Sequence, residues 1–230
     1  KNLNNSQKQA VNEINNSTSY KIIGPPGTGK TSTIVEIISQ LLKRRKKILV
    51  CGPSNISIDN IIEKFESSIF YSKTPTKFYR RGSSFKGLKA YNLEKIVDEI
   101  TKFVEKEDTD KNFKRTLKKI KDKYKNEIQL ETDLVFATVF SSRKELNHFD
   151  WVIVDEACQS SAVECFLALT HGQNIILVGD PNQLCHEFRS LYELLDMKTY
   201  LLDVQYRMCE RLIGFSNETF YNNKIKSFIK

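Results

Sequence analysis

The segment GPPGTGKT at residues 24–31 has the residue types and the spacing of a phosphate-binding loop. It follows the β-like run YKIIG and precedes a helix-like stretch, which is the context in which such a loop binds nucleotide phosphates. Gly27 and Gly29 allow backbone angles that turn successive N–H groups toward phosphate oxygens. The N-terminus of the next helix adds a positive partial charge. We expect Lys30 to reach the β- and γ-phosphates and the Thr31 hydroxyl to bind Mg²⁺.

Two carboxylates end the apolar run WVIV at residues 151–154. Asp155 would hold the Mg²⁺ shell beside the phosphate-binding loop, and Glu156 would orient and deprotonate the attacking water. The structural alternative is a strand that ends in ordinary surface acids. Two carboxylates directly after four apolar residues are costly to desolvate, however, unless a cation lies nearby. The second carboxylate also favours a hydrolase over a P-loop kinase.

The run NIILVGDPNQL at residues 174–184 places an amide just beyond the end of another strand. Ligands of an open α/β sheet bind at the carboxyl ends of its strands, so Gln183 would contact the γ-phosphate or its attacking water. An amide can donate and accept without adding charge, which suits a group that reports whether phosphate is present. GDPN is also good turn chemistry, and we expect the turn to place the glutamine.

The elements that would hold these residues alternate between short apolar runs and amphipathic stretches. Near-continuous Val, Ile and Leu runs are typical of strands buried on both faces. The alternation therefore predicts an α/β fold, with a parallel sheet and helices on both of its faces. The runs that indicate strands are residues 20–24, 47–52, 133–138, 149–156 and 174–180.

Residues 66 to about 130 differ from the rest of the chain in being dense in charge. Two stretches, 91–107 and 112–128, have helical spacing of apolar residues and polar faces. We expect a small helical insertion at residues 85–128. The charge run indicates a solvated face, and a contact with nucleic acid is the alternative.

Composition narrows the class of protein. Among 230 residues, 36 are Lys or Arg and 28 are Asp or Glu, a formal net charge of +8. This excess favours a polyanionic partner such as nucleic acid, although a lysine-rich proteome would also produce it. The five cysteines are scattered, which indicates a reducing compartment. No apolar run approaches the roughly 18 residues of a membrane span, and the N-terminus is polar. We therefore expect an intracellular protein, cytoplasmic or nuclear, without membrane contact.

Seven segments in order resemble the first motor domain of the superfamily 1 helicases, in the branch that holds the nonsense-mediated-decay RNA helicase, senataxin and the immunoglobulin-mu-binding helicase. They are LNNSQKQAV, GPPGTGKT, GPSNISIDN, VFATVFSS, VIVDEACQ, LVGDPNQL and VQYRM. DEA-x-Q and Q-Y-R-M are the most discriminating. The resemblance implies a RecA-like P-loop NTPase fold over residues 1–230, as the N-terminal ATP-binding domain of a helicase. It places the second RecA-like domain outside this chain.

The resemblance also assigns roles within the nucleotide site. Gln7 would bond the adenine edge and so select ATP, and Tyr206 would stack on the base. Arg207 would approach the phosphates from the domain cleft, and Gln183 would sense the γ-phosphate. For Gln7 the structural alternative is to face solvent, and for Tyr206 it is a core position. The nucleotide-binding residues would be Gln7, Gly27, Thr28, Gly29, Lys30, Thr31 and Tyr206.

Three small polar residues are expected on the nucleic-acid path. By the same resemblance, Ser54, Asn55 and Thr138 would touch the backbone phosphates, a contact that needs no base identity. The alternatives are a plain helix cap for Ser54 and Asn55 and a plain strand end for Thr138. The sequence departs from the family at Cys209-Glu210, where His-Pro is usual, and at Cys185-His186, where small residues and prolines are usual. These departures concern the interdomain surface.

We therefore expect the ATP-binding motor domain of an ATP-dependent helicase that moves 5′ to 3′ on RNA or DNA. Its cofactors would be ATP and Mg²⁺. Its partners would be single-stranded nucleic acid, with RNA slightly favoured, and a second motor domain of the same full-length protein. Alone the domain would be weakly active, because an arginine finger is worth about 10³ to 10⁵ in rate. The alternative is a nucleotide-gated single-domain scaffold that does not unwind. The catalytic residues would be Glu156, Lys30, Gln183 and Arg207.

Overall fold

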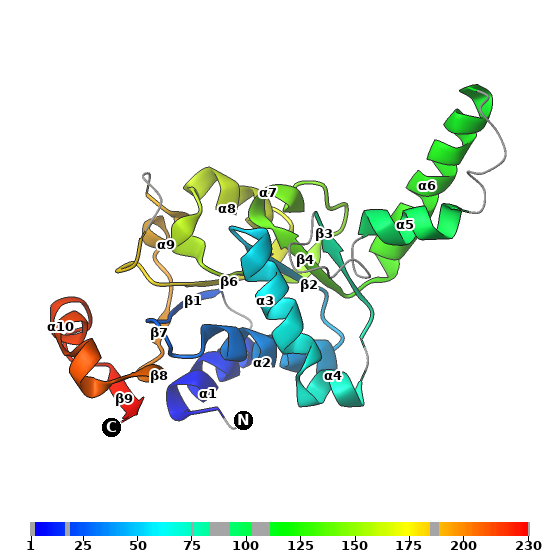
Figure 1. The fold of residues 1–230 in the computed structure, drawn as a ribbon. Helices are drawn as coiled ribbons and strands as arrows, with labels where there is room; N and C mark the ends of the chain where they lie inside the picture. Colours follow the sequence, from blue (N-terminus) through cyan, green and yellow to red (C-terminus); the bar gives the residue numbers. More distant parts are fainter. Residues whose placement is uncertain are drawn as a thin grey trace.

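A seven-stranded parallel sheet forms the centre of the molecule, in the strand order β3-β4-β2-β5-β6-β1-β7 (Figure 1). The computed structural model describes residues 3–16, 19–74, 76–82, 93–102, 111–184 and 189–229. The α/β prediction is confirmed. The strands of this sheet are β1 (Tyr20–Ile23), β2 (Ile48–Gly52), β3 (Phe78–Arg81), β4 (Leu134–Thr138), β5 (Phe149–Val154), β6 (Gly172–Gly179) and β7 (Thr199–Leu201).

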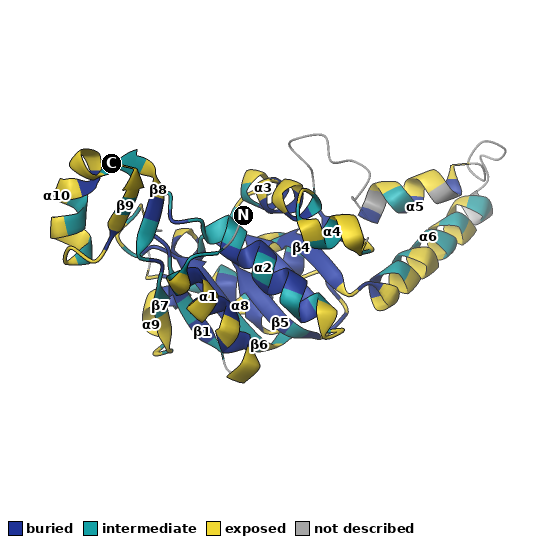
Figure 2. Ribbon diagram, turned by 90° about the horizontal axis from the view of Figure 1, so that it is seen from below, coloured by how far each residue is buried: buried dark blue, intermediate teal, exposed yellow. Residues whose placement is uncertain are grey.

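Side chains of alternate strand residues belong to two separate hydrophobic clusters, one on each face of the sheet. Val50 and Ile153 pack in the first cluster, with helices α1, α2 and α3, whereas Leu49 and Val152 pack in the second, with α7 and α8. Figure 2 shows the consequence: the central strands β2, β4 and β5 are almost wholly buried. The helices around the sheet are α1 (Asn5–Asn12), η1 (Glu13–Asn16), α2 (Lys30–Lys43), α3 (Asn55–Glu66), α4 (Ile69–Lys73), α7 (Val139–Ser142), η3 (Ala157–Gln159), α8 (Ala162–Leu169) and α9 (Leu191–Leu194).

Two helices lie where the sequence predicts an insertion. Helix α5 (Leu93–Thr101) packs on α6 (Lys111–Glu131), and the pair projects away from the sheet (Figure 1). Helix α6 runs three residues past the predicted end at residue 128, and residues 85–92 and 103–110 of the expected segment lie outside the described residues. The extent of the insertion as a unit therefore stays a prediction.

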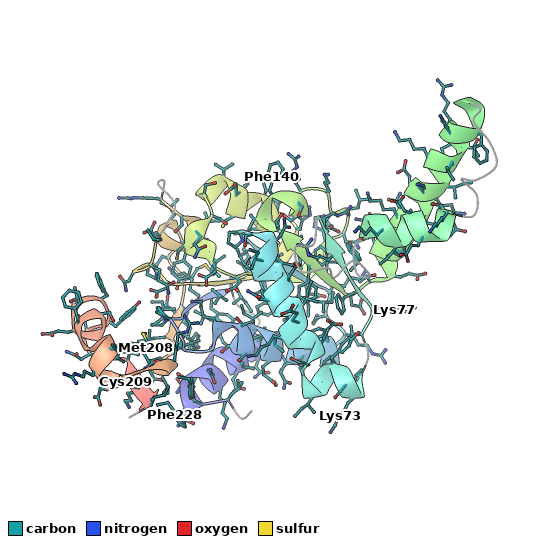
Figure 3. The ribbon with its side chains drawn as sticks, in the orientation of Figure 1. Lys73, Lys77, Phe140, Met208, Cys209 and Phe228 are labelled. Carbon is teal, nitrogen blue, oxygen red and sulfur yellow. The ribbon has the colours of Figure 1, made fainter. Side chains whose placement is uncertain are left out.

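The C-terminal segment forms a small unit beside the sheet. Strands β8 (Val204–Cys209) and β9 (Lys226–Ile229) pair in parallel, and α10 (Glu210–Tyr221) joins them. Met208, Cys209 and Phe228 belong to this unit (Figure 3). Cys209 caps α10 at the position where the family usually has His, while Cys185 and His186 lie outside the described residues. Among the helices that the structure describes, none is long and apolar enough to cross a membrane.

Candidate functional site

The carboxyl ends of three neighbouring strands meet at one edge of the sheet. Strand β6 lies between β1 and β5, with Ile23 paired to Gly179 and Val154 paired to Leu177. The Gly24 N–H donates to the Gly179 carbonyl oxygen at 2.9 Å, so the phosphate-binding loop leaves the sheet directly beside the end of β6. Because the strands are parallel, the segments that follow them emerge on the same side. The structure therefore brings together the three motifs with which the sequence analysis begins.

The loop at residues 24–31 has the backbone of an anion-binding turn. Gly27 and Gly29 have φ of 77° and 85°, which side chains with a Cβ rarely adopt. Gly29 is the N-cap of α2, so the first N–H groups of this helix open into the loop. Thr28 is fully buried, and its hydroxyl donates to the Pro25 carbonyl oxygen at 2.7 Å. The backbone is therefore already shaped for phosphate oxygens.

Lys30 connects the loop to the end of β5. Its Nζ donates to the Gly24 carbonyl oxygen at 2.8 Å and lies 3.4 Å from Glu156 Oε1. Thr31 follows Lys30 in the first turn of α2, directly after the loop. A carbonyl oxygen and a carboxylate thus hold the ammonium group from two sides, as phosphate oxygens would.

The two acidic residues after β5 differ in environment. Asp155 is buried, and its N–H donates to the Cys51 carbonyl oxygen at 2.8 Å. Burial raises the pKa of Asp155 to about 7, and the neighbouring charge of Glu156 adds to this effect against the attraction of Lys30. Glu156 has φ of 50°, a left-handed conformation that is uncommon for a residue with a side chain. Glu156 is the more exposed of the two residues, and its N–H donates to Asp155 Oδ1 at 3.0 Å.

The turn after β6 holds Gln183 in place. Asp180 Oδ1 accepts from the Asn182 N–H at 3.1 Å, and Asp180 Oδ2 accepts from Gln183 Nε2 at 2.7 Å. The Gln183 N–H closes the turn on the Asp180 carbonyl oxygen at 3.2 Å. The prediction that turn chemistry places this amide therefore agrees with the geometry. Its role in sensing phosphate stays a prediction.

Gln7 and Tyr206 approach the loop from opposite ends of the chain. Gln7 is 5% exposed and shares the buried face of α1, so the solvent-facing alternative is wrong. Its Nε2 donates to the Thr28 carbonyl oxygen at 2.9 Å, and its Oε1 accepts from the Asn4 N–H at 3.0 Å. Tyr206 is 40% exposed, so the core alternative is wrong for it too. Its hydroxyl accepts from Asn4 Nδ2 at 3.0 Å, which places it next to Gln7.

Gln205 is a residue of this site that the sequence reasoning missed. It is 1% exposed, and its Oε1 accepts from the N–H groups of Arg207 and Met208 at 2.8 Å each. The Tyr206 N–H donates to the Gly27 carbonyl oxygen at 2.9 Å, and a Cβ at Gly27 would lie 2.6 Å from Arg207 Cβ. Gln205 therefore shapes the turn that docks the C-terminal unit on the phosphate-binding loop. The signal available in the sequence was the place of Gln205 at the head of the motif Q-Y-R-M, which does not reveal the contacts of its side chain.

The residues predicted to touch nucleic acid lie farther along the same edge of the sheet. Gly52 at the end of β2 pairs with Thr138 at the end of β4, so Ser54 and Thr138 follow neighbouring strands. Ser54 caps α3 by accepting from the Ser57 N–H, and Thr138 caps α7 by accepting from the Ser141 N–H, both at 3.2 Å. The structure thus shows the predicted cap for Ser54, while Thr138 is a strand end, as its alternative had it, that also caps a helix. As caps, Ser54 and Thr138 both lie at the carboxyl edge of the sheet.

Asn55 is fixed by Arg80, another residue that the sequence reasoning missed. Arg80 Nη2 donates to Asn55 Oδ1 at 2.9 Å, and Arg80 Nε donates to Asp59 Oδ1 at 2.7 Å. Arg80 and Asp59 are both fully buried. The sequence does not reveal this contact, because Arg80 lies in the short edge strand β3 and its partners lie in α3.

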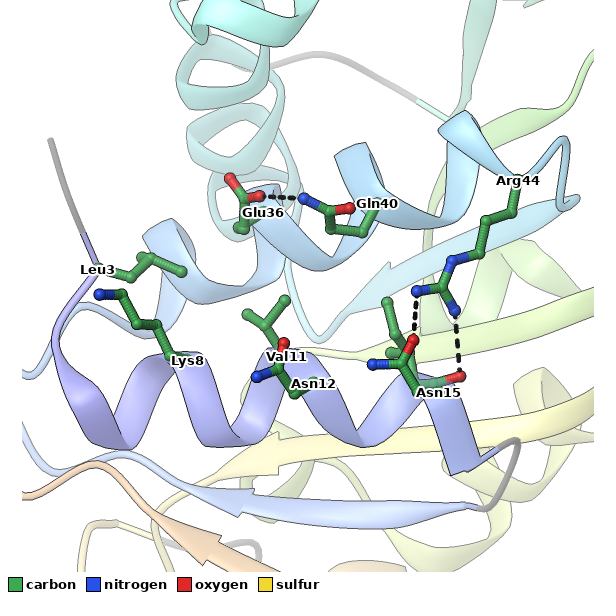
Figure 4. Close-up of a pocket in the computed structure, with 9 residues that line it drawn as sticks. Leu3, Lys8, Val11, Asn12, Asn15, Glu36, Gln40 and Arg44 are labelled. Carbon is green, nitrogen blue, oxygen red and sulfur yellow. Dashed lines mark hydrogen bonds between the residues drawn. The ribbon is translucent and has the colours of Figure 1, made fainter.

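One of the hollows in the described part of the chain lies away from this edge. A groove of about 490 Å³ runs between α1 and α2 and η1, where Arg44 Nη2 donates to Asn15 Oδ1 at 2.5 Å and Glu36 accepts from Gln40 (Figure 4). It does not include the phosphate-binding loop.

Comparison with known proteins identifies related chains. A family model described as an AAA domain matches residues 2–85 and 89–185, and a second model of the same description matches residues 185–229. The DNA polymerase alpha-associated DNA helicase A of Schizosaccharomyces pombe is 34% identical over 98% of this chain and 40% of its own length. The DNA-binding protein SMUBP-2 of Mesocricetus auratus is 31% identical over 97% of this chain and 27% of its own. The chain thus spans less than half the length of these relatives.

Solved structures share the fold. An arterivirus nonstructural protein 10 (helicase), in complex with DNA, superposes with a TM-score of 0.57 over 96% of this chain and 44% of that chain. The two sequences are 16% identical. The similarity therefore concerns the arrangement of the sheet and its helices.

Proposed function

Because this chain belongs to the superfamily 1 helicases, of which it forms the first RecA-like domain, we propose that it binds and hydrolyses ATP as one half of a motor that moves along single-stranded nucleic acid. The observation that carries the proposal is the contact of Lys30 with Glu156, beside the buried Asp155. An ammonium group, a partly exposed carboxylate and a buried carboxylate lie together beside the phosphate-binding loop. This is the arrangement that phosphoryl transfer to water requires.

Lys30 and Glu156 exchange partners when nucleotide binds. Without phosphate, Lys30 is held by the Gly24 carbonyl oxygen and by Glu156. The β- and γ-phosphates offer the ammonium group a denser negative charge, so Lys30 turns to them and releases Glu156. The released carboxylate then accepts the proton of the attacking water. Gln183 orients that water or the γ-phosphate from the end of β6, and Arg207 approaches the phosphates from β8.

Asp155 and Thr31 fit a magnesium ion. A buried carboxylate whose pKa is raised to about 7 is a group that a cation would stabilise in its charged form. A hydroxyl and a carboxylate are oxygen ligands of the kind that Mg²⁺ prefers, so Thr31 and Asp155 are the residues that would hold it. When bound, Mg²⁺ would supply positive charge to the phosphates of the nucleotide.

The base is read by Gln7 and covered by Tyr206. With its two contacts made, the Gln7 amide keeps a second N–H and a second lone pair. These match the N7 acceptor and the N6 donor of adenine, whereas guanine presents an acceptor at O6. Tyr206 turns from its tilted contact with Phe228, at 5.1 Å between ring centroids, to cover the base. The site therefore selects ATP over GTP.

Nucleic acid crosses the same edge beyond β5. The Asn55 amide carbonyl is occupied by Arg80, so its NH₂ group is the end left for a phosphate oxygen. Ser54 and Thr138 flank this group at the ends of β2 and β4. A second motor domain of the natural protein would close the cleft from the side of β8 and α10 and add an arginine to the phosphates.

The test is hydrolysis of ATP by the natural full-length protein, with single-stranded RNA, with single-stranded DNA and with neither. We expect nucleic acid to stimulate turnover. The one of the two, RNA or DNA, that stimulates turnover more strongly is the preferred partner. Lys30→Ala should abolish the activity, while Lys64→Ala, an exposed lysine of α3, should not. Binding of ATP without any hydrolysis in wild type would instead support a nucleotide-gated scaffold.

A further inference from the structure

We propose that Tyr221, at the end of α10, positions Gln183 and makes its contact with the γ-phosphate depend on where α10 lies. The inference rests on the proposed role of Gln183. Tyr221 is far from Gln183 in sequence and belongs to the small C-terminal unit rather than to the sheet. It would act through Asp180, without touching the nucleotide.

Asp180 is the acceptor that the two residues share. The Tyr221 hydroxyl and Gln183 Nε2 both donate to Asp180 Oδ2, each at 2.7 Å. Asp180 is 1% exposed, so its carboxylate depends on such donors in place of water. Burial and the bond to Asp180 raise the pKa of Tyr221 well above its ordinary value, so the hydroxyl stays protonated and remains a donor at neutral pH.

The orientation of the carboxylate decides the orientation of the amide. An amide side chain has a donor end and an acceptor end, and the carboxylate can accept only from the donor end. The bond to Asp180 Oδ2 therefore fixes which end of Gln183 faces the turn. Without the tyrosine hydroxyl, the carboxylate loses one of its three donors and holds the amide less firmly in that direction.

Helix α10 is placed to transmit movement through this contact. It packs mainly on β8 and β9, and among its residues, all of them described, only Ile213 is buried. Asn182 Nδ2 donates to the Phe220 carbonyl oxygen at 3.0 Å, so the turn after β6 holds the last turn of α10 at two points. Figure 1 shows α10 beside the sheet rather than on it. A shift of α10 must therefore move the donor to Asp180.

The experiment compares the affinities of the natural full-length protein for a non-hydrolysable ATP analogue and for ADP, both with Mg²⁺. The variants are Tyr221→Phe, Gln183→Ala and the double substitution. Tyr221→Phe should reduce the preference for the ATP analogue by about three- to tenfold, the range of one typical net hydrogen bond, because Tyr221 acts through Asp180 and does not contact the nucleotide itself. The double variant should be no worse than Gln183→Ala, because the two residues act in one chain. The matched control, Tyr124→Phe on the exposed part of α6, should change nothing.

The outcomes separate the two proposals. If Gln183→Ala reduces the preference but Tyr221→Phe does not, or if their effects add, the inference is wrong and the role of Gln183 stands. If Gln183→Ala has no effect, both fall. Equal loss of affinity for both nucleotides in Tyr221→Phe would mean a structural role and would also overturn the inference. As a second readout, hydrogen exchange of α10 should differ between the two nucleotides in wild type but not in Tyr221→Phe.

Discussion

The buried pair of Arg80 and Asp59 carries the largest energetic effect that we predict for a single side chain. The two groups lie 2.7 Å apart and are fully buried, and the same guanidinium holds Asn55. Removal of one member of such a pair leaves a buried charge without its partner, at a cost of about 3–5 kcal/mol. Asp59→Ala should lower the free energy of unfolding by that amount. The double substitution Arg80→Met with Asp59→Leu removes both charges and should recover most of the loss.

Urea unfolding at pH 7, followed by circular dichroism, measures these differences. The control is Lys121→Ala, which breaks the solvent-exposed pair with Asp98 and should cost no more than about 1 kcal/mol. The double variant should fold but bind single-stranded nucleic acid more weakly, because Asn55 loses its anchor. A cost below about 1 kcal/mol for Asp59→Ala, or a double variant as unstable as the single one, would refute the reasoning.

Three further predictions concern pH, base selection and the C-terminal unit. Burial would raise the pKa of Glu13, but hydrogen bonds from Tyr200 and Lys198 outweigh it and lower this pKa to about 2. Its stabilising effect is therefore present above about pH 4.5 and lost as pH falls to about 2. Glu13→Gln should cost about 1–2 kcal/mol at pH 7, after allowance for solvent screening, with the difference vanishing toward pH 2 in urea titrations. Gln7→Ala should reduce the preference for ATP over GTP at least several-fold in KM, since an unmade hydrogen bond costs about 1 kcal/mol or more. Gln205→Ala should weaken nucleotide binding, measured by calorimetry, although Gln205 does not touch nucleotide.

The sequence predicted the elements whose pattern is local. Central strands such as β2 and β5 are continuous apolar runs, because both of their faces are covered by helices. The phosphate-binding loop is equally local, since its glycines and the following helix set its backbone. Local signals therefore identified the inner strands of the sheet, the loop and the two carboxylates that follow β5.

The missed elements depend on partners far away in the chain. Strand β3 reads FYRR, and its two arginines are buried because Asp59 and Glu145 neutralise them. Strand β7 has three residues and forms only by pairing with β1 at the other sheet edge. The sequence analysis did not predict the roles of Gln205, Tyr221 and Arg80 for the same reason. Each acts through a contact that no spacing in the sequence reveals.

Turnover and nucleotide affinity of Glu156→Gln test the central claim most directly, that strand ends converge on one nucleotide to hydrolyse it. The substitution keeps shape and removes the proton acceptor. We predict that ATP hydrolysis by the natural protein falls at least about 10²-fold, while the Kd for Mg-ATP stays within a few-fold of wild type. Glu131→Gln on α6 serves as the control. Unchanged turnover in Glu156→Gln would contradict the account.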